Sequence, residues 1–272
     1  MILAKLRDRL AARPSSPFFA DNPARPGGAD RRYMIATSGR TGSELLCSRI
    51  AEYGQLGFPM EFLNTSYIAE FDRLFPNPSL DDFERYVQSQ FSSPATGVFG
   101  IKTDWWHFRE ASQLGLFPSF LQPLDLIVHL RRDDFVGQAV SFELALKSGV
   151  WHLRDAFTSA DDVHAGQAYD PAAIKAHARN ILNQEYYWRQ HFKQVDTPIV
   201  EATYEQLSAD VDQTIRQIAQ AFDIKLQPRR NAMPDMRKTR SNIAVEWTRR
   251  FHEDCEDFVS FWHEYRGLAS AA

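Results

Sequence analysis

YMIATSGRTGSELLCSRI, at residues 33–50, is the stretch of this chain that decides its fold. It begins with a short apolar, β-prone run and then breaks into a loop of small residues at 37–43. An amphipathic helical pattern follows the loop. A strand, a small-residue loop and a helix in this order point backbone N–H groups and a helix N-terminus at a phosphate. The stretch therefore predicts an anion site at the end of a strand.

The loop supplies the residue types that such a site needs. Gly39 and Gly42 allow a close approach of the backbone to a ligand. Ser43 suits an N-cap or a phosphate donor, and Arg40 carries a permanent positive charge. The spacing GxxxxGK[ST] of nucleotide triphosphatases is absent, and no Lys precedes the Ser. An ordinary strand-to-helix turn is the alternative interpretation of these residues.

The composition is that of a globular protein with room for one large α/β domain or two small ones. The chain has 272 residues, of which 44% are hydrophobic and 24% are charged. A net charge of −4 argues against a dedicated nucleic-acid-binding protein. The two cysteines, Cys47 and Cys255, are far apart, and Cys47 falls on an apolar helix face. A buried free thiol and a reducing, cytoplasmic compartment are therefore expected.

The first 32 residues differ in composition from the rest. Residues 1–13 form a basic amphipathic pattern without the apolar core of a secretory signal, and residues 13–32 are rich in Pro, Gly and Asp. We therefore expect an N-terminal arm or linker at 1–32 and a single domain at 33–272. The short helix of the arm is expected to pack on its own domain, with peripheral contact to a membrane surface as the alternative.

Strand and helix patterns alternate from residue 33 onward. The runs at 126–131 and 197–203 are almost continuously apolar, as in a parallel sheet that is covered on both faces. Alternating units of this length favour an α/β fold with three layers and a mostly parallel central sheet. The expected strands are 33–38, 98–102, 126–131 and 197–203, and the expected helices are 43–53, 81–91, 134–147, 171–193, 205–222 and 243–265.

A second anion site is predicted at the end of the third expected strand. Arg131 and Arg132 stand there, and Ser141 follows in the next helix. In open α/β sheets ligands bind at the carboxyl ends of the strands, and an Arg with a helical hydroxyl can grip a phosphate. The alternative is a surface Arg pair before a helix that Asp133 or Asp134 caps.

Six motifs in one order resemble those of the bacterial carbohydrate sulfotransferase family typified by trehalose 2-sulfotransferase. The similarity spans most of the chain after the arm, to about residue 260. SGRTGS, GFPMEF and QAVSF are its specific parts, whereas YEQL is weak alone. The motifs are SGRTGS (38–43), GFPMEF (57–62), GIKTDWW (100–106), RRDDFVGQAVSF (131–142), GVW (149–151) and YEQL (204–207).

The resemblance implies a P-loop-like domain that uses 3′-phosphoadenosine 5′-phosphosulfate (PAPS) as donor, needs no metal and works as a homodimer. Its acceptor would be a carbohydrate or a glycolipid. Arg40 would lie on the bridging or sulfuryl oxygens, while Arg132 and Ser141, assisted by Arg131, would hold the 3′-phosphate. The phosphosulfate would lie on Ser38, Gly39, Arg40, Thr41, Gly42 and Ser43.

The acceptor hydroxyl needs a base, for which the resemblance implies Glu61. Phe58, Met60 and Phe62 would supply an apolar setting that raises the pKa of this carboxyl. Asp104 is the rival, because the KTD that ends with it looks like the Lys-Thr/Ser-His segment of cytosolic sulfotransferases with an acid in place of the His. Lys102 would lower the pKa of Asp104. Lys102 would also contact the sulfuryl group or the acceptor, with a structural ion pair as the alternative.

Two departures from the family bear on its chemistry. Glu44 stands where the family has a Thr, and we expect it to face away from the donor. Phe58 stands where the trehalose enzyme has a sugar-binding acid, so the expected acceptor is not trehalose. Trp105, Trp106 and Trp151 would stack on sugar faces or belong to the core.

The sequence thus favours a sulfotransferase over two alternatives. A P-loop-like nucleotide kinase would need the GK[ST] Lys and a Mg²⁺-ligand motif, and the chain shows neither. An inactive nucleotide- or glycan-binding module is disfavoured because Arg40, Ser43, Arg132 and Glu61 are retained. The basic segment at 237–242 would close over the donor nucleotide or form a solvated turn.

Overall fold

The computed structural model describes residues 27–75, 77–115, 123–151, 159–229 and 241–271. The chain divides into two compact units. The sheet unit comprises Met1–Arg131 and Gln184–Met233, and the helical unit comprises Arg132–Asn183 and Pro234–Ala272. The helix expected at 1–13 lies outside the described residues, so the division into an arm and a single domain stays a prediction.

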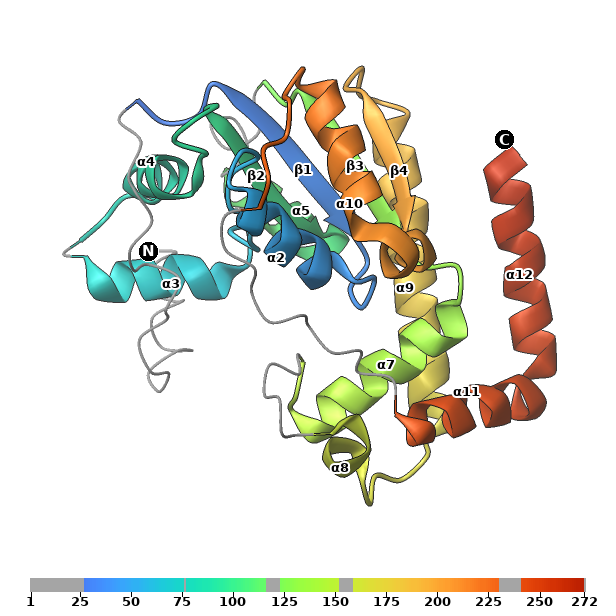
Figure 1. Cartoon of the computed structure of the whole chain (residues 1–272). Helices are drawn as coiled ribbons and strands as arrows, with labels where there is room; N and C mark the ends of the chain where they lie inside the picture. The colour runs from blue at the N-terminus through green and yellow to red at the C-terminus, as the bar shows by residue number, and fades with distance from the viewer. Residues whose placement is uncertain (1–26, 76, 116–122, 152–158, 230–240, 272) are drawn as a thin grey trace. The chain divides into compact units, whose positions relative to one another are not determined.

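Four parallel strands form the centre of the sheet unit, as the apolar runs predicted. These strands are β1 (Arg31–Thr37), β2 (Val98–Asp104), β3 (Leu126–Arg131) and β4 (Ile199–Thr203). Their order is β2-β1-β3-β4, so β1 has β2 on one side and β3 on the other (Figure 1). This reversal of strand order beside β1 marks the position where open α/β sheets bind ligands at their carboxyl edge.

Helices cover both faces of the sheet, which confirms the predicted three layers. The covering helices are α2 (Ser43–Tyr53), α3 (Thr65–Leu74), α4 (Leu80–Phe91), α5 (Trp105–Gln113), α10 (Tyr204–Ala221) and the second half of α9 (Pro171–Phe192). Alternate residues of β1 point to opposite faces. Tyr33 and Ile35 pack with α2 and α10, in front of the strands in Figure 1, whereas Met34 and Ala36 pack with α3, α4 and α5. Burying each such Ile or Met stabilises the fold by about 1.5–3 kcal/mol.

The segment at 57–62 is fixed along β2 by backbone contacts. Gly57 has a φ of 75°, and a Cβ there would lie 2.7 Å from the carbonyl oxygen of Val98. The amide of Lys102 donates to the carbonyl oxygen of Met60 at 2.8 Å, and Met60 forms a parallel bridge with Ile101. The segment therefore holds its position next to β2 through its main chain.

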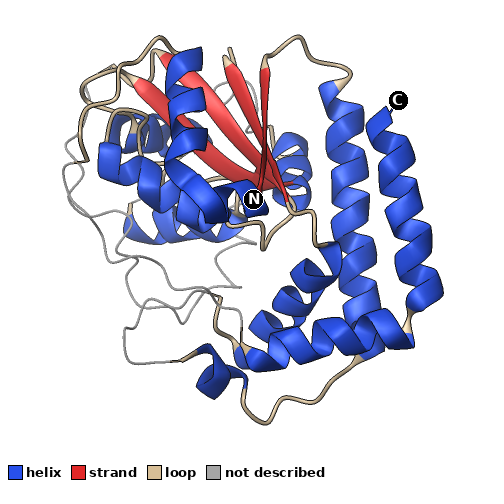
Figure 2. Ribbon diagram, turned by 45° about the vertical axis from the view of Figure 1, so that its right-hand side comes forward, coloured by secondary structure: helices blue, strands red, loops and turns tan. Residues whose placement is uncertain are grey.

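The helical unit surrounds a core of its own. It contains α7 (Phe135–Ser148), α8 (Ala160–His164), the first half of α9, α11 (Asn242–Asp254) and α12 (Glu256–Ala271). The single helix expected at 243–265 is wrong, because the chain leaves helical geometry at Cys255, with φ −134° and ψ 35° (Figures 1 and 2). This corner lets Phe251 before it and Val259 after it join the same core cluster.

Most of the other helices follow the sequence patterns. Those expected at 43–53, 81–91, 134–147, 171–193 and 205–222 occur as α2, α4, α7, α9 and α10. The patterns did not predict α3, α5 and α8, which begin at side-chain caps provided by Asn64, Asp104 and Ser159. Within the described part of the chain, no helix is both long and apolar enough to cross a bilayer.

Both cysteines are free thiols, and Cys47 is buried as expected. Burial raises the pKa of Cys47 to about 12, with further raising effects from Glu44 and Glu61 and an opposing one from Lys102. The thiol is therefore protonated at neutral pH and is a poor nucleophile.

Candidate active site

The loop between β1 and α2 contains three residues with left-handed backbone conformation. Gly39, Arg40 and Gly42 have φ values of 77°, 55° and 78°. Left-handed residues among right-handed ones turn successive N–H groups into one concavity, which is the geometry of an anion-binding nest. A non-glycine residue in this region is strained, at a cost of about 1–3 kcal/mol, and such strain clusters at functional sites.

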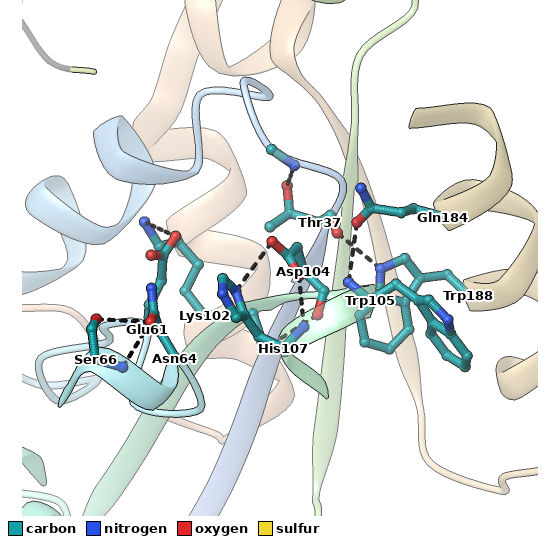
Figure 3. A network of polar contacts seen from close by, with 12 residues as sticks. Thr37, Glu61, Asn64, Ser66, Lys102, Asp104, Trp105, His107, Gln184 and Trp188 are labelled. Carbon is teal, nitrogen blue, oxygen red and sulfur yellow. Dashed lines mark hydrogen bonds and ion pairs between the residues drawn. The ribbon is translucent and has the colours of Figure 1, made fainter. Parts of the chain in front are cut away.

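The loop is held rigidly at its base. The Thr37 and Thr41 hydroxyls hydrogen-bond to each other. The indole N–H of Trp188 donates to the carbonyl oxygen of Thr37 at 2.9 Å (Figure 3). Gly42 lies against the Tyr204 ring, since a Cβ on this glycine would come within 2.8 Å of Tyr204 Cδ2. This contact gives the YEQL motif a structural role that the sequence alone did not show.

The N-terminus of α2 differs from those of several other helices of the chain. Its N-cap is Gly42, which has no side chain to accept from the first-turn amides. By contrast, side chains cap α3, α4, α5, α7, α10 and α11. A helix N-terminus whose N-cap residue offers no side-chain acceptor, together with the helix dipole, favours an anion at this position.

A buried ammonium lies beside the loop and joins two carboxylates. Lys102 Nζ is 3.0 Å from Glu44 Oε2 and 3.1 Å from Glu61 Oε1. The Lys102 side chain is only 6% exposed. Burial lowers the pKa of Lys102, but attraction by Glu61, Cys47 and Glu44 outweighs it, so the pKa lies above its ordinary value. Lys102 is therefore a charged, structurally held ion-pair residue.

The expected apolar setting of Glu61 is wrong. Phe62 is fully buried in the core. The Glu61 carboxylate instead pairs with the ammonium of Lys102, with Oε1 3.1 Å from Nζ (Figure 3). Phe58 and Met60 are partly buried against the same core. The neighbouring side chains thus pack into the core, whereas the Glu61 side chain is 38% exposed.

Asp104 caps α5 and contacts a histidine that the sequence analysis missed. Its Oδ1 accepts from the amide of His107 at 2.9 Å, and its Oδ2 lies 3.2 Å from His107 Nδ1 (Figure 3). Burial raises the pKa of Asp104. The hydrogen bonds from His107 and its charge lower the pKa by more than burial raises it, so it lies below its ordinary value. The expected lowering of the Asp104 pKa is confirmed. Its main cause is His107, whereas the ammonium of Lys102 pairs with Glu44 and Glu61.

The sheet brings these groups to one edge. Thr37, at the base of the loop, pairs in register with Asp104 on the adjacent strand. The bridge between Met60 and Ile101 sets Glu61 beside Lys102. The loop and both candidate bases therefore belong to the same carboxyl edge of the sheet unit. A His three residues after a capping Asp was the signal in the sequence that could have identified the pair.

The residues of the second predicted anion site fall in different parts of the chain. Arg131 ends β3 in the sheet unit, whereas Arg132 and Ser141 belong to the helical unit. Asp134 is the N-cap of α7, and its Oδ1 accepts from the amide of Gly137 at 2.8 Å. Within the helical unit, Arg266 donates to the carbonyl oxygen of Arg132 at 2.7 Å. Capping by Asp134 is thus confirmed, and the 3′-phosphate assignment stays a prediction.

The three candidate tryptophans differ in exposure. Trp105 stacks on Tyr187 with ring centroids 5.4 Å apart and packs against the core. Trp106 and Trp151 are exposed, and Trp106 meets Tyr187 edge to face. Of the basic segment, residues 237–240 lie outside the described part, while Ser241 caps α11. Among described residues, no cluster of three or more His, Cys, Asp or Glu is arranged to hold a metal.

Comparisons with known proteins agree on one family. A family model described as Stf0 sulphotransferase matches residues 32–254. The trehalose 2-sulfotransferase of Mycolicibacterium smegmatis is 24% identical over 264 residues, covering 82% of this chain and 95% of that protein. The trehalose 2-sulfotransferase of Mycobacterium tuberculosis is 25% identical over 269 residues, covering 83% and 96%.

Two solved structures are also similar to this chain. A sulfotransferase domain from the curacin biosynthetic pathway aligns with a TM-score of 0.49 and 13% identity, covering 82% of this chain and 83% of that one. A sulfotransferase domain from the Synechococcus PCC 7002 olefin synthase aligns with a TM-score of 0.44 and 14% identity, covering 86% and 98%.

Proposed function

Because the chain belongs to the Stf0 sulphotransferase family, we propose that it transfers a sulfuryl group from PAPS to a hydroxyl of a carbohydrate or glycolipid. The observation that carries the proposal is the loop at 38–43, with its left-handed residues and the uncapped N-terminus of α2 behind it. This geometry suits an anion held by backbone amides. The reaction also needs no metal, because positioning and charge stabilisation are its main requirements.

The donor would occupy two anion sites. Residues 38–43 would hold the phosphosulfate, with Arg40 on the bridging or sulfuryl oxygens. Arg132 and Ser141, assisted by Arg131, would hold the 3′-phosphate through charge-assisted hydrogen bonds. The donor supplies the sulfuryl group, and adenosine 3′,5′-bisphosphate remains after transfer.

Glu61 is the proposed base. It accepts the proton of the acceptor hydroxyl while the acceptor oxygen bonds to sulfur and the bond from sulfur to the 5′-phosphate oxygen breaks. Its Oε1 lies on Lys102, and no hydrogen bond to Oε2 occurs among the described residues. Both oxygens of Asp104 already contact His107, which makes Asp104 the weaker candidate. Lys102 would hold Glu61 in position and balance the negative charges of Glu44 and Glu61 at the edge of the sheet.

The acceptor class follows from the relatives. Both are trehalose 2-sulfotransferases, which supports a carbohydrate acceptor. Phe58 in place of a sugar-binding acid supports a sugar other than trehalose. We further propose a homodimer in the cytoplasm, in which the arm at 1–32 makes at most peripheral contact with a membrane.

Ligand binding and product analysis test this function. Adenosine 3′,5′-bisphosphate should raise the melting temperature and ATP should not, whereas the reverse result would favour a kinase. Labelled PAPS, incubated with the protein and a lipid or polysaccharide extract, should yield a sulfated product by mass spectrometry. Tight bisphosphate binding without transfer to any acceptor or to water would indicate an inactive binding module.

A further inference from the structure

One ring nitrogen of His107 lies at ion-pair distance from Asp104, and the other is available to a ligand. Asp104 holds the backbone amide of His107 with one carboxylate oxygen and lies 3.2 Å from Nδ1 with the other. Since the two ring nitrogens lie on opposite sides of the imidazole, Nε2 faces away from Asp104. Among the described residues, Nε2 has no hydrogen-bond partner, and the side chain is 30% exposed. The ring is thus oriented and still accessible to a ligand.

The position of His107 places it at the reacting edge of the sheet. Asp104 pairs in register with Thr37, so the first turn of α5 begins beside the anion-binding loop. Glu61 is close enough to affect the charge of His107. Lys102, a second cation near His107 at this edge, is held by Glu44 and Glu61. His107 therefore brings a donor that these two carboxylates do not occupy.

The groups that face His107 favour its charged form. Burial of the ring lowers the pKa of His107, but Asp104, Glu61 and Glu110 raise it, and the net pKa lies above the ordinary value. These groups belong to three parts of the fold: the end of β2, the segment before α3, and α5 itself. An imidazolium with Nδ1–H toward Asp104 carries its second N–H on Nε2.

We propose that His107 is a further catalytic residue, whose Nε2–H donates a hydrogen bond to a sulfuryl oxygen during transfer, and that Asp104 is its positioning residue. This inference rests on the proposed function. His107 keeps its proton through the reaction, while Glu61 accepts the proton of the acceptor hydroxyl. Fixed donors aimed at oxygens where charge develops are among the largest contributions to such catalysis.

The first test separates catalysis from donor binding. His107→Phe keeps a flat ring and removes the donor, so single-turnover release of labelled sulfate from PAPS to water should fall about 10²–10³-fold. The affinity for adenosine 3′,5′-bisphosphate, measured by calorimetry, should stay unchanged because this ligand has no sulfuryl group. If release persists at the wild-type rate, or if both quantities fall together, the inference is overturned. If the wild type neither binds the bisphosphate nor releases sulfate, the proposed function itself fails.

The second test uses the direction of the pH dependence. Sulfate release by the wild type should decrease as the pH rises through the ionisation of His107, since the donor is then lost. His107→Gln keeps an amide donor that does not titrate, and should remove this alkaline decrease. Asp104→Asn keeps the helix cap and should move the decrease to lower pH. A rate that instead increases through the same ionisation would make His107 a base, and an unchanged profile in His107→Gln would make it structural.

Discussion

Lys102 shows at the scale of a single residue how the charges of the site are arranged. Its ammonium is buried between the carboxylates of Glu44 and Glu61. A buried charge is stable only with partners, so removing one carboxylate would leave the ammonium undercompensated. The sequence suggested an ion pair for Lys102 as one of two roles, but it gave no means of naming the partners.

Glu61→Gln keeps the shape of the side chain and removes its basicity. We expect sulfuryl transfer to fall by roughly 10²–10⁴-fold, with bisphosphate affinity unchanged. Asp104→Asn is the matched control. It should lose less sulfuryl-transfer activity, because Asn keeps the cap of α5 and Glu61 is intact. Steady-state rates with the identified acceptor measure both. Near-full activity in Glu61→Gln together with a large loss in Asp104→Asn would assign the base to Asp104.

Arg40 combines strain with a proposed catalytic charge. Since its φ is 55°, Arg40→Gly should relieve backbone strain, and the melting temperature should stay the same or rise. Turnover should nevertheless fall far more than bisphosphate affinity, because the lost guanidinium is assigned to the sulfuryl group. Arg40→Ala is the control that loses the charge and keeps the strain. An equal loss of turnover and affinity would make Arg40 a general donor-binding residue.

At the scale of elements, the N-cap of α2 differs in kind from the N-caps of other helices. Most helices near the site begin at a side-chain cap, whereas α2 begins at a glycine that lies against Tyr204. The loop is thus fixed by packing on α10 from a distant part of the chain. Ligand oxygens are then the natural partners for the first amides of α2.

Gly42→Ala tests this packing. The new Cβ would lie 2.8 Å from the Tyr204 ring in a backbone with φ 78°, so the protein should lose more stability than left-handed strain alone costs. Gly149→Ala is the matched control, with φ 71° and nothing within 4 Å of its Cβ. Its cost should be about 1–2 kcal/mol. Urea unfolding measures both variants, and equal losses would show that the Tyr204 contact does not constrain the loop.

The Asp104–His107 pair at the start of α5 should make stability depend on pH. The raised pKa of folded His107 gives stability that is complete below about pH 6.5 and is lost as the pH rises through the folded value. The lowered pKa of folded Asp104 gives stability that is complete above about pH 4 and is lost as the pH falls through the folded value. The difference in unfolding free energy between wild type and His107→Gln should therefore be largest near pH 5–6. Urea unfolding at pH 5.5 and pH 9 measures it, and a constant difference would contradict the ion pair.

Local patterns explain what the sequence could predict. The strands and most helices were predictable because apolar periodicity and turn residues are local signals, and the strand at 126–131 occurs with the expected bounds. The corner at Cys255 carries no Gly or Pro, so nothing local marked it. The neighbours of Glu61 depend on Met60 pairing with Ile101, a contact between distant parts of the chain. His107 was missed because its role arises only when β2 ends at Asp104 and α5 begins there.

At the scale of the whole molecule, the proposed donor binding can be measured through the nucleotide that remains after transfer. Adenosine 3′,5′-bisphosphate at a hundredfold excess over its dissociation constant should stabilise the fold by about 2.7 kcal/mol. Arg132→Ala should weaken its binding by roughly 1.5–3 kcal/mol through loss of a charge-assisted contact. Arg249→Ala is the control for net charge, since this exposed arginine pairs with Glu253. Calorimetry compares the two, and wild-type affinity in Arg132→Ala would refute the 3′-phosphate assignment.

The main-chain attachment of residues 57–62 to β2 bears on how such an enzyme can diversify. The Phe58 amide donates to the carbonyl oxygen of Phe91 in α4, and the Lys102 amide of β2 donates to that of Met60. Both bonds join backbone atoms, so they do not depend on which side chains stand at 58 and 61. Position 58, proposed to select the acceptor, and position 61, proposed to activate it, thus lie on one segment whose main-chain bonds allow side-chain substitution. A lineage can vary its acceptor preference there by single substitutions, without rebuilding the scaffold that holds the donor.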